Sequence, residues 1–230
     1  MTHTHNDRST GGERRVTVDA LIHAGAVAVL RLPDASRGES VVHALLAGGV
    51  RAIEVTMTTA GALDLIAALS TSFGDALLLG AGSVLTSDSA RRAIDAGARF
   101  IVSPVLDETV IATAHAGGIP ALPGAFTPTE IMRAHRAGAD LVKVFPADSL
   151  GPAYIRSVLA PLPYLELMPT GGVTPDNVGA WIAAGAVTVG LGSALVSPTL
   201  VSAGDFAGIS ARARRVTDGI ALARAERRAT

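Results

Sequence analysis

The chain has 230 residues, of which 49% are hydrophobic and only 3% aromatic, and its formal net charge is -1 at pH 7. This length suits one domain with a sizeable core, and the near-neutral charge argues against nucleic acid as a partner. No apolar stretch is long enough and free enough of charge to span a membrane. The absence of cysteine excludes disulfides, thiolate metal sites and a cysteine nucleophile, and fits a cytoplasmic protein.

The first residues, 1–15, are polar and contain no apolar run. A secretory signal peptide requires such a run, so this segment is interpreted as a flexible tail. No linker or change of composition divides the rest of the chain. We therefore expect a single domain over residues 16–230.

From residue 16 onward one pattern repeats, in which a helical segment ends in a turn of small residues and a short apolar run follows. Ala24-Gly25-Ala26 and Ala47-Gly48-Gly49 are two of these turns. The apolar runs predict eight strands: Ala26–Leu30, Ala52–Val55, Leu77–Ala81, Phe100–Ser103, Ala121–Pro123, Leu141–Phe145, Glu166–Pro169 and Thr188–Leu191. The segment Ala203–Arg227 is expected to form one or two closing helices.

Eight short strands that alternate with helices are typical of βα units, and strands this apolar need cover on both faces. Eight units in this length favour a closed (β/α)₈ barrel of the TIM type over an open doubly wound sheet. Such barrels carry their sites at the C-terminal ends of the strands. A functional residue should therefore lie at or just after a strand end and point inward.

Lys143 meets this condition, because strand side chains alternate and Leu141, Lys143 and Phe145 should face the barrel interior. Burying a charged lysine is costly, and nucleophilic attack on a ketone needs the neutral amine. A lysine kept for an ion pair or for phosphate binding would also satisfy this pattern. Glu54 should face inward from the second strand, where it could act as a general acid/base or simply pair with the lysine. The two residues together favour catalysis.

Glycine turns follow the seventh and eighth strands at Thr170-Gly171-Gly172 and Gly192-Ser193. Backbone amides at these two strand ends are the usual phosphate site of such barrels, although either pair alone would be only a turn. Gly80-Ala81-Gly82-Ser83 is weaker evidence, because its glycines could serve close packing. Arg31, just after the first strand, could hold a carboxylate through two parallel hydrogen bonds or form an exposed salt bridge.

The histidines His23, His43, His115 and His135 fall on helical segments, away from the strand ends. No cluster of histidine and carboxylate side chains is placed to hold zinc at the barrel mouth, so no metal is expected. A dinucleotide fingerprint with its downstream acidic partner is also missing. We therefore expect no cofactor.

Taken together, these residues resemble the 2-keto-3-deoxy-6-phosphogluconate aldolases, which include the 4-hydroxy-2-oxoglutarate aldolases. The resemblance runs in family order from Ala26 to Val196. It rests on the stretches Ala47-Gly48-Gly49-Val50-Arg51-Ala52-Ile53-Glu54-Val55-Thr56, Gly80-Ala81-Gly82-Ser83-Val84, Val102-Ser103-Pro104, Leu122-Pro123-Gly124, Lys143-Val144-Phe145-Pro146-Ala147, Pro169-Thr170-Gly171-Gly172-Val173 and Gly192-Ser193-Ala194-Leu195-Val196.

The resemblance implies a class I aldolase, a carbon–carbon lyase without a cofactor, in which Lys143 forms the Schiff base and Glu54 is the general acid/base. It places Arg31, Ser83, Pro104 and Thr170 around the pyruvyl carboxylate and the site wall, and Phe145 beside the lysine. It assigns Gly171, Gly172 and Ser193, with the neighbouring Gly192, to the phosphate site. The implied reaction is cleavage of 2-keto-3-deoxy-6-phosphogluconate to pyruvate and glyceraldehyde 3-phosphate, by a homotrimer.

Two features of the sequence differ from many family members. Ser83 stands where threonine is usual, which keeps the hydroxyl. Thr58 stands where several members have a phosphate-binding arginine, which puts the strength of phosphate recognition in question. The substrate could instead be the galactonate epimer or 4-hydroxy-2-oxoglutarate. From another class, a phosphate-binding barrel isomerase, or a phosphate-binding protein without catalysis, also remains open, because one barrel fold hosts many chemistries.

Overall fold

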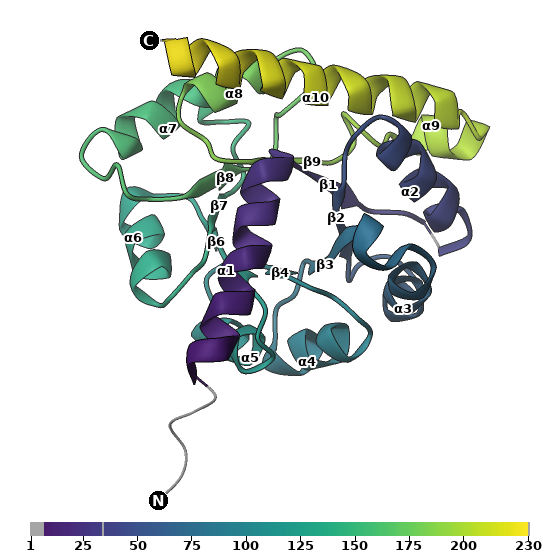
Figure 1. The fold of residues 1–230 in the computed structure, drawn as a ribbon, viewed down its shortest axis with the longest axis horizontal. Coiled ribbons are helices and arrows are strands. Elements are labelled where there is room, and N and C mark those ends of the chain that lie inside the picture. The colour runs from purple at the N-terminus through teal and green to yellow at the C-terminus, as the bar shows by residue number, and fades with distance from the viewer. Residues whose placement is uncertain (1–6, 34, 230) are drawn as a thin grey trace, which may run out of the picture.

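The structure, a computed structural model, describes residues 7–33 and 35–229. Strands and helices alternate along the chain and form a ring of helices around a central set of strands (Figure 1). The strands are β1 (Ala26–Leu30), β2 (Ala52–Thr56), β3 (Leu78–Gly82), β4 (Ile101–Val102), β5 (Ala121–Leu122), β6 (Gly124–Ala125), β7 (Val142–Val144), β8 (Leu167–Pro169) and β9 (Val189–Leu191). The α-helices are α1 (Asp7–Ala24), α2 (Gly38–Ala47), α3 (Ala62–Phe73), α4 (Ser87–Asp95), α5 (Glu108–Ala116), α6 (Pro128–Arg136), α7 (Gly151–Leu159), α8 (Val178–Ala183), α9 (Pro198–Ala203) and α10 (Phe206–Ala229).

All strand pairs are parallel, in the orders β5-β4-β3-β2-β1-β9 and β6-β7-β8. Two seams join these sheets into a barrel. At one seam, Thr170 and Gly190 form a parallel bridge between the segments of β8 and β9. At the other, Pro123 separates β5 from β6, but its carbonyl accepts a hydrogen bond from the Lys143 N–H at 2.9 Å. The predicted (β/α)₈ fold is confirmed.

Each of the eight predicted strands has a counterpart in the structure. The fifth, Ala121–Pro123, corresponds to β5, and the structure adds the short strand β6 directly after Pro123, because a proline has no N–H to donate to a neighbouring strand. The expectation for the closing segment is also confirmed, since α10 covers most of Ala203–Arg227 as one helix.

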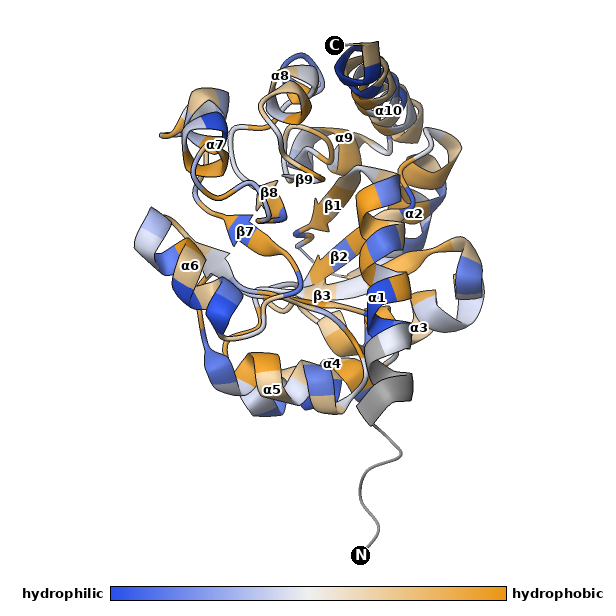
Figure 2. Cartoon of the chain, turned by 60° about the vertical axis from the view of Figure 1, so that its left-hand side comes forward, coloured by the Kyte–Doolittle hydropathy of each residue, from blue (hydrophilic) through white to orange (hydrophobic). Residues whose placement is uncertain are grey.

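The strands are mostly hydrophobic, and the surrounding helices alternate between hydrophobic and hydrophilic stretches (Figure 2). Ile53, Val55, Val142 and Val144 belong to the large core between the strands and the helices. Other residues in the strands or beside them, such as Leu141 just before β7, form a second, smaller core inside the barrel. The alternation predicted for the strands that carry Glu54 and Lys143 is therefore confirmed.

Helix α1 crosses the barrel in the view down its axis (Figure 1). Its side chains Val18 and Leu21 are buried in the inner core, where they pack with residues such as Val27 and Leu141 at the beginning of strands. Helix α1 therefore closes the N-terminal end of the barrel. The flexible tail expected over residues 1–15 is wrong for residues 7–15, which are the first turns of this helix. Residues 1–6 of that tail lie outside the described part of the chain.

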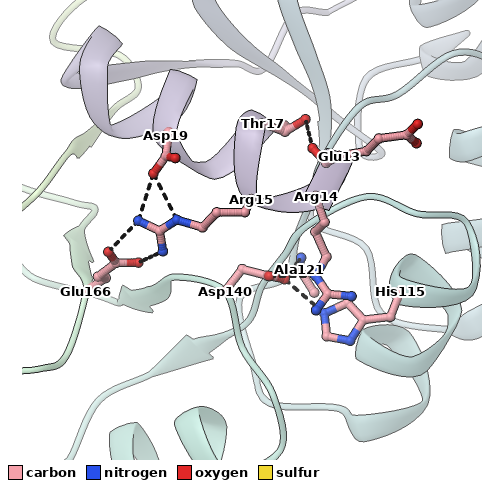
Figure 3. Close-up of polar contacts among 9 residues, drawn as sticks. All are labelled: Glu13, Arg14, Arg15, Thr17, Asp19, His115, Ala121, Asp140 and Glu166. Carbon is pink, nitrogen blue, oxygen red and sulfur yellow. Dashed lines mark hydrogen bonds and ion pairs between the residues drawn. The ribbon is translucent and has the colours of Figure 1, made fainter. Parts of the chain in front are cut away.

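Long-range polar contacts explain why a polar segment is ordered here (Figure 3). The Arg14 Nε lies 2.9 Å from Oδ1 of Asp140, just before β7. The other oxygen of Asp140 lies 2.9 Å from Nε2 of His115 and accepts the Ala121 N–H. Arg15 pairs with Glu166, which lies 151 residues away. Partners this distant leave no local pattern in the sequence, so local patterns alone predict a tail here.

Helix α10 runs along one edge of the molecule, where it lies beside α8 and α2 (Figure 1). Arg214 donates to the carbonyl of Ala47 at the end of α2, and Arg227 donates to the carbonyl of Ile182 near the end of α8. Arg224 donates to the carbonyls of Ile22 and His23 in the last turn of α1. Positive charges interact favourably with helix C-termini, so these arginine contacts stabilise the packing of α10 on the barrel. None of the described helices is both long enough and apolar enough to cross a membrane.

Candidate active site

A cavity of about 430 Å³ opens at the C-terminal ends of the strands. Its wall comes from β1, β2, β7 and β9 and from segments that follow β1, β3, β4, β7, β8 and β9. Every residue that the sequence placed in the site lies on this wall: Arg31, Glu54, Ser83, Pro104, Lys143, Phe145, Thr170, Gly171, Gly172, Gly192 and Ser193. The structure thus brings together residues that are up to 162 positions apart in the chain, the separation of Arg31 and Ser193.

Lys143 lies in the middle of β7, with only 6% of its side chain exposed. It is the only lysine in the 230 residues; all other positively charged side chains, histidine aside, are arginines. The chain therefore has a single side-chain amine, and this amine lies inside the cavity. The count could have been read from the sequence, and it strengthens the case for Lys143 as the nucleophile.

Glu54 faces Lys143 across the cavity, with 3.9 Å between Oε1 and Nζ. This gap exceeds hydrogen-bond length, so the two groups attract each other without direct hydrogen bonding. Among the described residues, neither carboxylate oxygen has a hydrogen-bond partner. Burial raises the pKa of the Glu54 carboxyl above its usual value, although the charges of Lys143 and Arg31 act in the opposite direction. A buried acid of this kind can exchange a proton at moderate pH.

The Phe145 ring stands beside the lysine on the same face of β7, with Nζ 5.0 Å from the ring centroid. A positive charge at this distance is attracted to the electron-rich face of the ring. Phe145 can therefore stabilise a cation formed at Nζ while keeping that side of the cavity apolar.

Glycines on the inner face of the barrel make room for larger side chains. A β-carbon at Gly80 would collide with the ring of Phe100, and one at Gly82 would stand 2.5 Å from Oε1 of Glu54. A β-carbon at Gly190 would overlap the hydroxyl of Thr170. These glycines therefore serve close packing, as considered from the sequence. Gly82 in addition lies directly against the Glu54 side chain of the site.

The turn after β8 has the geometry of an anion site. Gly171 and Gly172 have φ values of 97° and 71°, a region that side chains rarely adopt. In the described part of the chain, the backbone N–H groups of Gly171, Gly172 and Ser193 donate no hydrogen bond. The Thr170 hydroxyl is buried and also lacks a partner. These unpaired donors on one side of the cavity suit an oxyanion.

Arg31 and Ser83 contribute further polar groups to the wall. Arg31 has no hydrogen bond or ion pair within residues 7–33 and 35–229, so the exposed salt bridge considered from the sequence is not formed. Ser83 is the only described residue other than glycine with positive φ, at 58°. Backbone strain of this kind is held at functional sites by the surrounding structure, here by the bond from the Val84 N–H to the Val102 carbonyl at 3.1 Å.

Seven further residues line the cavity without having been predicted: Val29, Val173, Thr174, Gly190, Ala194, Val196 and Pro198. Val29 and Gly190 lie inward by the same alternation that placed Glu54, so their position could have been inferred. The others follow β8 and β9, where loop geometry decides which side chain turns inward. Thr58 does not line the cavity, and its hydroxyl lies 3.0 Å from that of Thr56.

The four histidines considered above lie on α1, α2, α5 and α6. Within the part of the chain that the structure describes, no three side chains of metal-ligand type come together. The polar groups of the cavity are instead one amine, one carboxylate, one guanidinium, hydroxyls and free amides. This set can bind a dianionic keto compound and transfer protons at its carbon atoms.

Comparison with known proteins agrees with this chemistry. The sequence model described as "KDPG and KHG aldolase" matches residues 18–212. A 2-dehydro-3-deoxy-phosphogluconate aldolase of Treponema pallidum is 38% identical over 194 residues, 84% of this chain and 92% of its own. A probable 2-dehydro-3-deoxy-6-phosphogalactonate aldolase of Rhizobium meliloti is 39% identical over 180 residues, 78% of this chain and 84% of its own.

A solved structure of a Legionella pneumophila KDPG aldolase, with pyruvate captured as a covalent carbinolamine, superposes with a TM-score of 0.80. That protein is 27% identical, and the match covers 86% of this chain and 97% of the other. These similarities decide between the classes left open by the sequence, and favour the aldolase over a barrel isomerase or a non-catalytic protein. The chain belongs to the KDPG and KHG aldolase family and is a Schiff-base aldolase, a carbon–carbon lyase built on a (β/α)₈ barrel.

Proposed function

We propose that the protein cleaves 2-keto-3-deoxy-6-phosphogluconate to pyruvate and glyceraldehyde 3-phosphate, with Lys143 as the nucleophile and Glu54 as the general acid/base. The observation that carries this proposal is the position of the single lysine, buried in the cavity 3.9 Å from a buried carboxylate. The match to the family supports the reaction class, and the arrangement of residues supports the role of each group.

The reaction begins when the neutral amine of Lys143 attacks the C2 carbonyl of the substrate. Loss of water then gives a protonated imine, whose positive charge withdraws electrons from the C3–C4 bond. The Phe145 ring, 5.0 Å from Nζ, lies close enough to stabilise this cation. No metal is required in this mechanism, because the imine itself accepts the electron pair.

Glu54 acts next, in its ionised form. It takes the proton of the C4 hydroxyl, directly or through a water molecule, as the C3–C4 bond breaks and the aldehyde leaves. The electron pair of that bond becomes the enamine of pyruvate on Lys143. Glu54 then returns the proton to C3, and hydrolysis of the imine releases pyruvate. The raised pKa of Glu54 suits a group that must both accept and donate a proton.

The two anionic ends of the substrate would bind at different parts of the wall. Arg31 and Ser83 are assigned to the pyruvyl carboxylate, with Pro104 and Thr170 completing the wall around it. The free amides of Gly171, Gly172 and Ser193, with Gly192 beside them, are assigned to the phosphate. Within the described residues the Arg31 guanidinium makes no hydrogen bond or ion pair, which suits it to a carboxylate ligand.

A second substrate has a specific observation in its favour, since the Rhizobium meliloti relative is named for the galactonate compound. The two sugar acids differ in the orientation of the C4 hydroxyl. The hydroxyl of Thr170 is buried and has no hydrogen-bond partner among the described residues, so it is a candidate for the group that distinguishes the two orientations. Steady-state cleavage of both phosphorylated epimers and of 4-hydroxy-2-oxoglutarate, compared by kcat/KM, tests the assignment. A preference for the galactonate compound would overturn the gluconate proposal and leave the lyase class intact.

We also propose that the enzyme acts as a homotrimer, as the family resemblance implies. Three large apolar side chains are exposed near the cavity end of neighbouring strands: Leu85 after β3, Val105 after β4 and Phe126 after β6. A second copy of the chain is the natural cover for such a surface. Sedimentation of the native protein and of Val105→Glu tests this. A native protein that sediments as a monomer would rule the trimer out.

A further inference from the structure

The Glu54 carboxylate rests against a strand position that has no side chain. A β-carbon at Gly82 would lie 2.5 Å from Oε1 and 2.8 Å from Cδ of Glu54. Oε1 is also the atom that lies 3.9 Å from Nζ of Lys143. We propose that Gly82 is a positioning residue, whose missing side chain sets how closely the Glu54 carboxylate approaches the reacting atoms.

The β2–β3 pairing explains this arrangement. Glu54 pairs in register with Gly80, and Thr56 pairs with Gly82. Gly80 and Gly82 lie two residues apart and share the inner face of β3. The space above Gly80 is filled by the Phe100 ring, whereas the space above Gly82 is filled by the Glu54 carboxylate. The Glu54 side chain therefore leans toward the C-terminal end of its neighbour strand, where the cavity opens.

Shape, rather than hydrogen bonding, holds the carboxylate in place. In the described structure both of its oxygens lack a hydrogen-bond partner. The backbone at Gly82 is fixed, because its carbonyl accepts the Met57 N–H at 2.8 Å and the Ala81 N–H is bonded to the Phe100 carbonyl at 3.0 Å. Gly82 has no positive φ, so alanine can adopt its conformation. An added methyl group would therefore displace the flexible end of Glu54 and leave the strand in place.

This inference rests on the proposed role of Glu54, and the experiment distinguishes a failure of the Gly82 inference from a failure of the Glu54 assignment. Gly82→Ala should lower kcat at least about tenfold, because small misplacements of a catalytic group are costly, with KM changed less than about threefold. In the Glu54→Asp background the carboxylate is shorter and clears the methyl group. There, the same Gly82→Ala change should lower kcat less than about twofold.

Gly80→Ala is the matched control, because it adds the same methyl group to the same face of β3. There the methyl group would meet the Phe100 ring instead of the Glu54 carboxylate. It should lower Tm but leave kcat per active site unchanged. Active sites are counted by trapping pyruvate on the enzyme with borohydride, which corrects for misfolded protein. Gly82→Ala should instead retain full trapping capacity per folded molecule and still turn over slowly.

Several outcomes would overturn the inference. Normal kcat in Gly82→Ala together with slow turnover in Glu54→Gln would reject the role of Gly82 alone. Near-normal turnover in Glu54→Gln would reject the proposed function itself. If the fold-loss of kcat in the double variant equalled the product of the fold-losses in the two single variants, Gly82 and Glu54 would not be coupled. If Gly82→Ala fails to fold, the double variant Gly82→Ala with Glu54→Asp should be more stable than Gly82→Ala alone. Equal loss of structure in the two variants would show that the added methyl group does not press on Glu54.

Discussion

Lys143 and Glu54 lie on opposite sides of the cavity, on β7 and β2, with 3.9 Å between Nζ and Oε1. This distance is too long for a hydrogen bond but short enough for a substantial electrostatic interaction between the two groups. Both side chains are buried, at 6% and 1% exposure. The pair is thus close enough for both groups to reach neighbouring carbon atoms of one substrate.

Lys143 should be the site at which pyruvate is trapped by borohydride. Because the chain has a single lysine, intact mass should show one pyruvyl adduct, and Lys143→Gln should show none. Peptide mapping distinguishes the lysine from the terminal amine. An adduct found only at the terminal amine, or a Lys143→Gln variant that still turns over normally, would remove the Schiff-base assignment.

Glu54→Gln should slow cleavage by at least about a hundredfold, the scale of a general acid/base contribution. Glutamine has nearly the same shape, so the fold and the trapping of pyruvate on Lys143 should survive. Exchange of the pyruvate methyl hydrogens with deuterated water, followed by NMR, isolates the proton-transfer step. Exchange at the native rate would show that Glu54 serves only as a structural partner.

The same substitution should make the protein more stable at neutral pH. Burial raises the pKa of Glu54 above its ordinary value of 4.5. The folded state therefore holds this proton more tightly than the unfolded chain, and stability is lost as pH rises from the unfolded to the folded pKa. Glutamine cannot ionise, so the Tm advantage of Glu54→Gln should be small below pH 4.5 and grow above it. A difference in Tm that does not depend on pH would contradict this account.

Chelating agents should leave cleavage unchanged, because the proposed mechanism uses the imine as its electron sink. Activity is measured before and after prolonged treatment with a chelator, and again after adding a divalent ion. Loss of activity that the ion restores would indicate that a metal takes part in the reaction.

Asp140 should be the main polar anchor of α1. Asp140→Ala removes the pairs with Arg14 and His115 and the bond from the Ala121 N–H, all at 2.9 Å and largely shielded from water. We expect a loss of about 2–4 kcal/mol in unfolding free energy, measured by urea denaturation, with kcat of the folded enzyme unchanged.

The control for this change is Asp75→Ala, which breaks the exposed ion pair with Arg99. Such pairs contribute less than about 1 kcal/mol, so this variant should resemble the native protein. Equal effects of the two substitutions would mean that the cluster around Asp140 does not stabilise α1.

The contrast between Lys143 and Arg14 shows what can be read from this sequence. Lys143 sits in an apolar run whose alternation is decided by neighbours one and two residues away, so its inward direction was predictable. Arg14 and Arg15 are ordered by Asp140 and Glu166, which local patterns cannot reveal. Gly82 is intermediate, because its inward face follows from alternation but its contact with Glu54 depends on the register of two strands. The sequence prediction placed Pro123 inside the fifth strand, although its missing N–H could have indicated the interruption there.

Thr58 provides the last prediction, which concerns how strongly the phosphate is held. Its side chain is exposed on the turn after β2, its hydroxyl is hydrogen-bonded to that of Thr56, and it contributes no charge to the cavity. We expect Thr58→Arg to lower KM for the phosphorylated substrate by the equivalent of about 1–2 kcal/mol, the scale of a hydrogen bond to a charged group. Cleavage of 4-hydroxy-2-oxoglutarate, which has no phosphate, should stay nearly unchanged. Thr58→Gln is the control for added bulk without charge. If the arginine altered both substrates alike, or neither, the amides of Gly171, Gly172 and Ser193 would already suffice for the phosphate, and position 58 would play no part in its recognition.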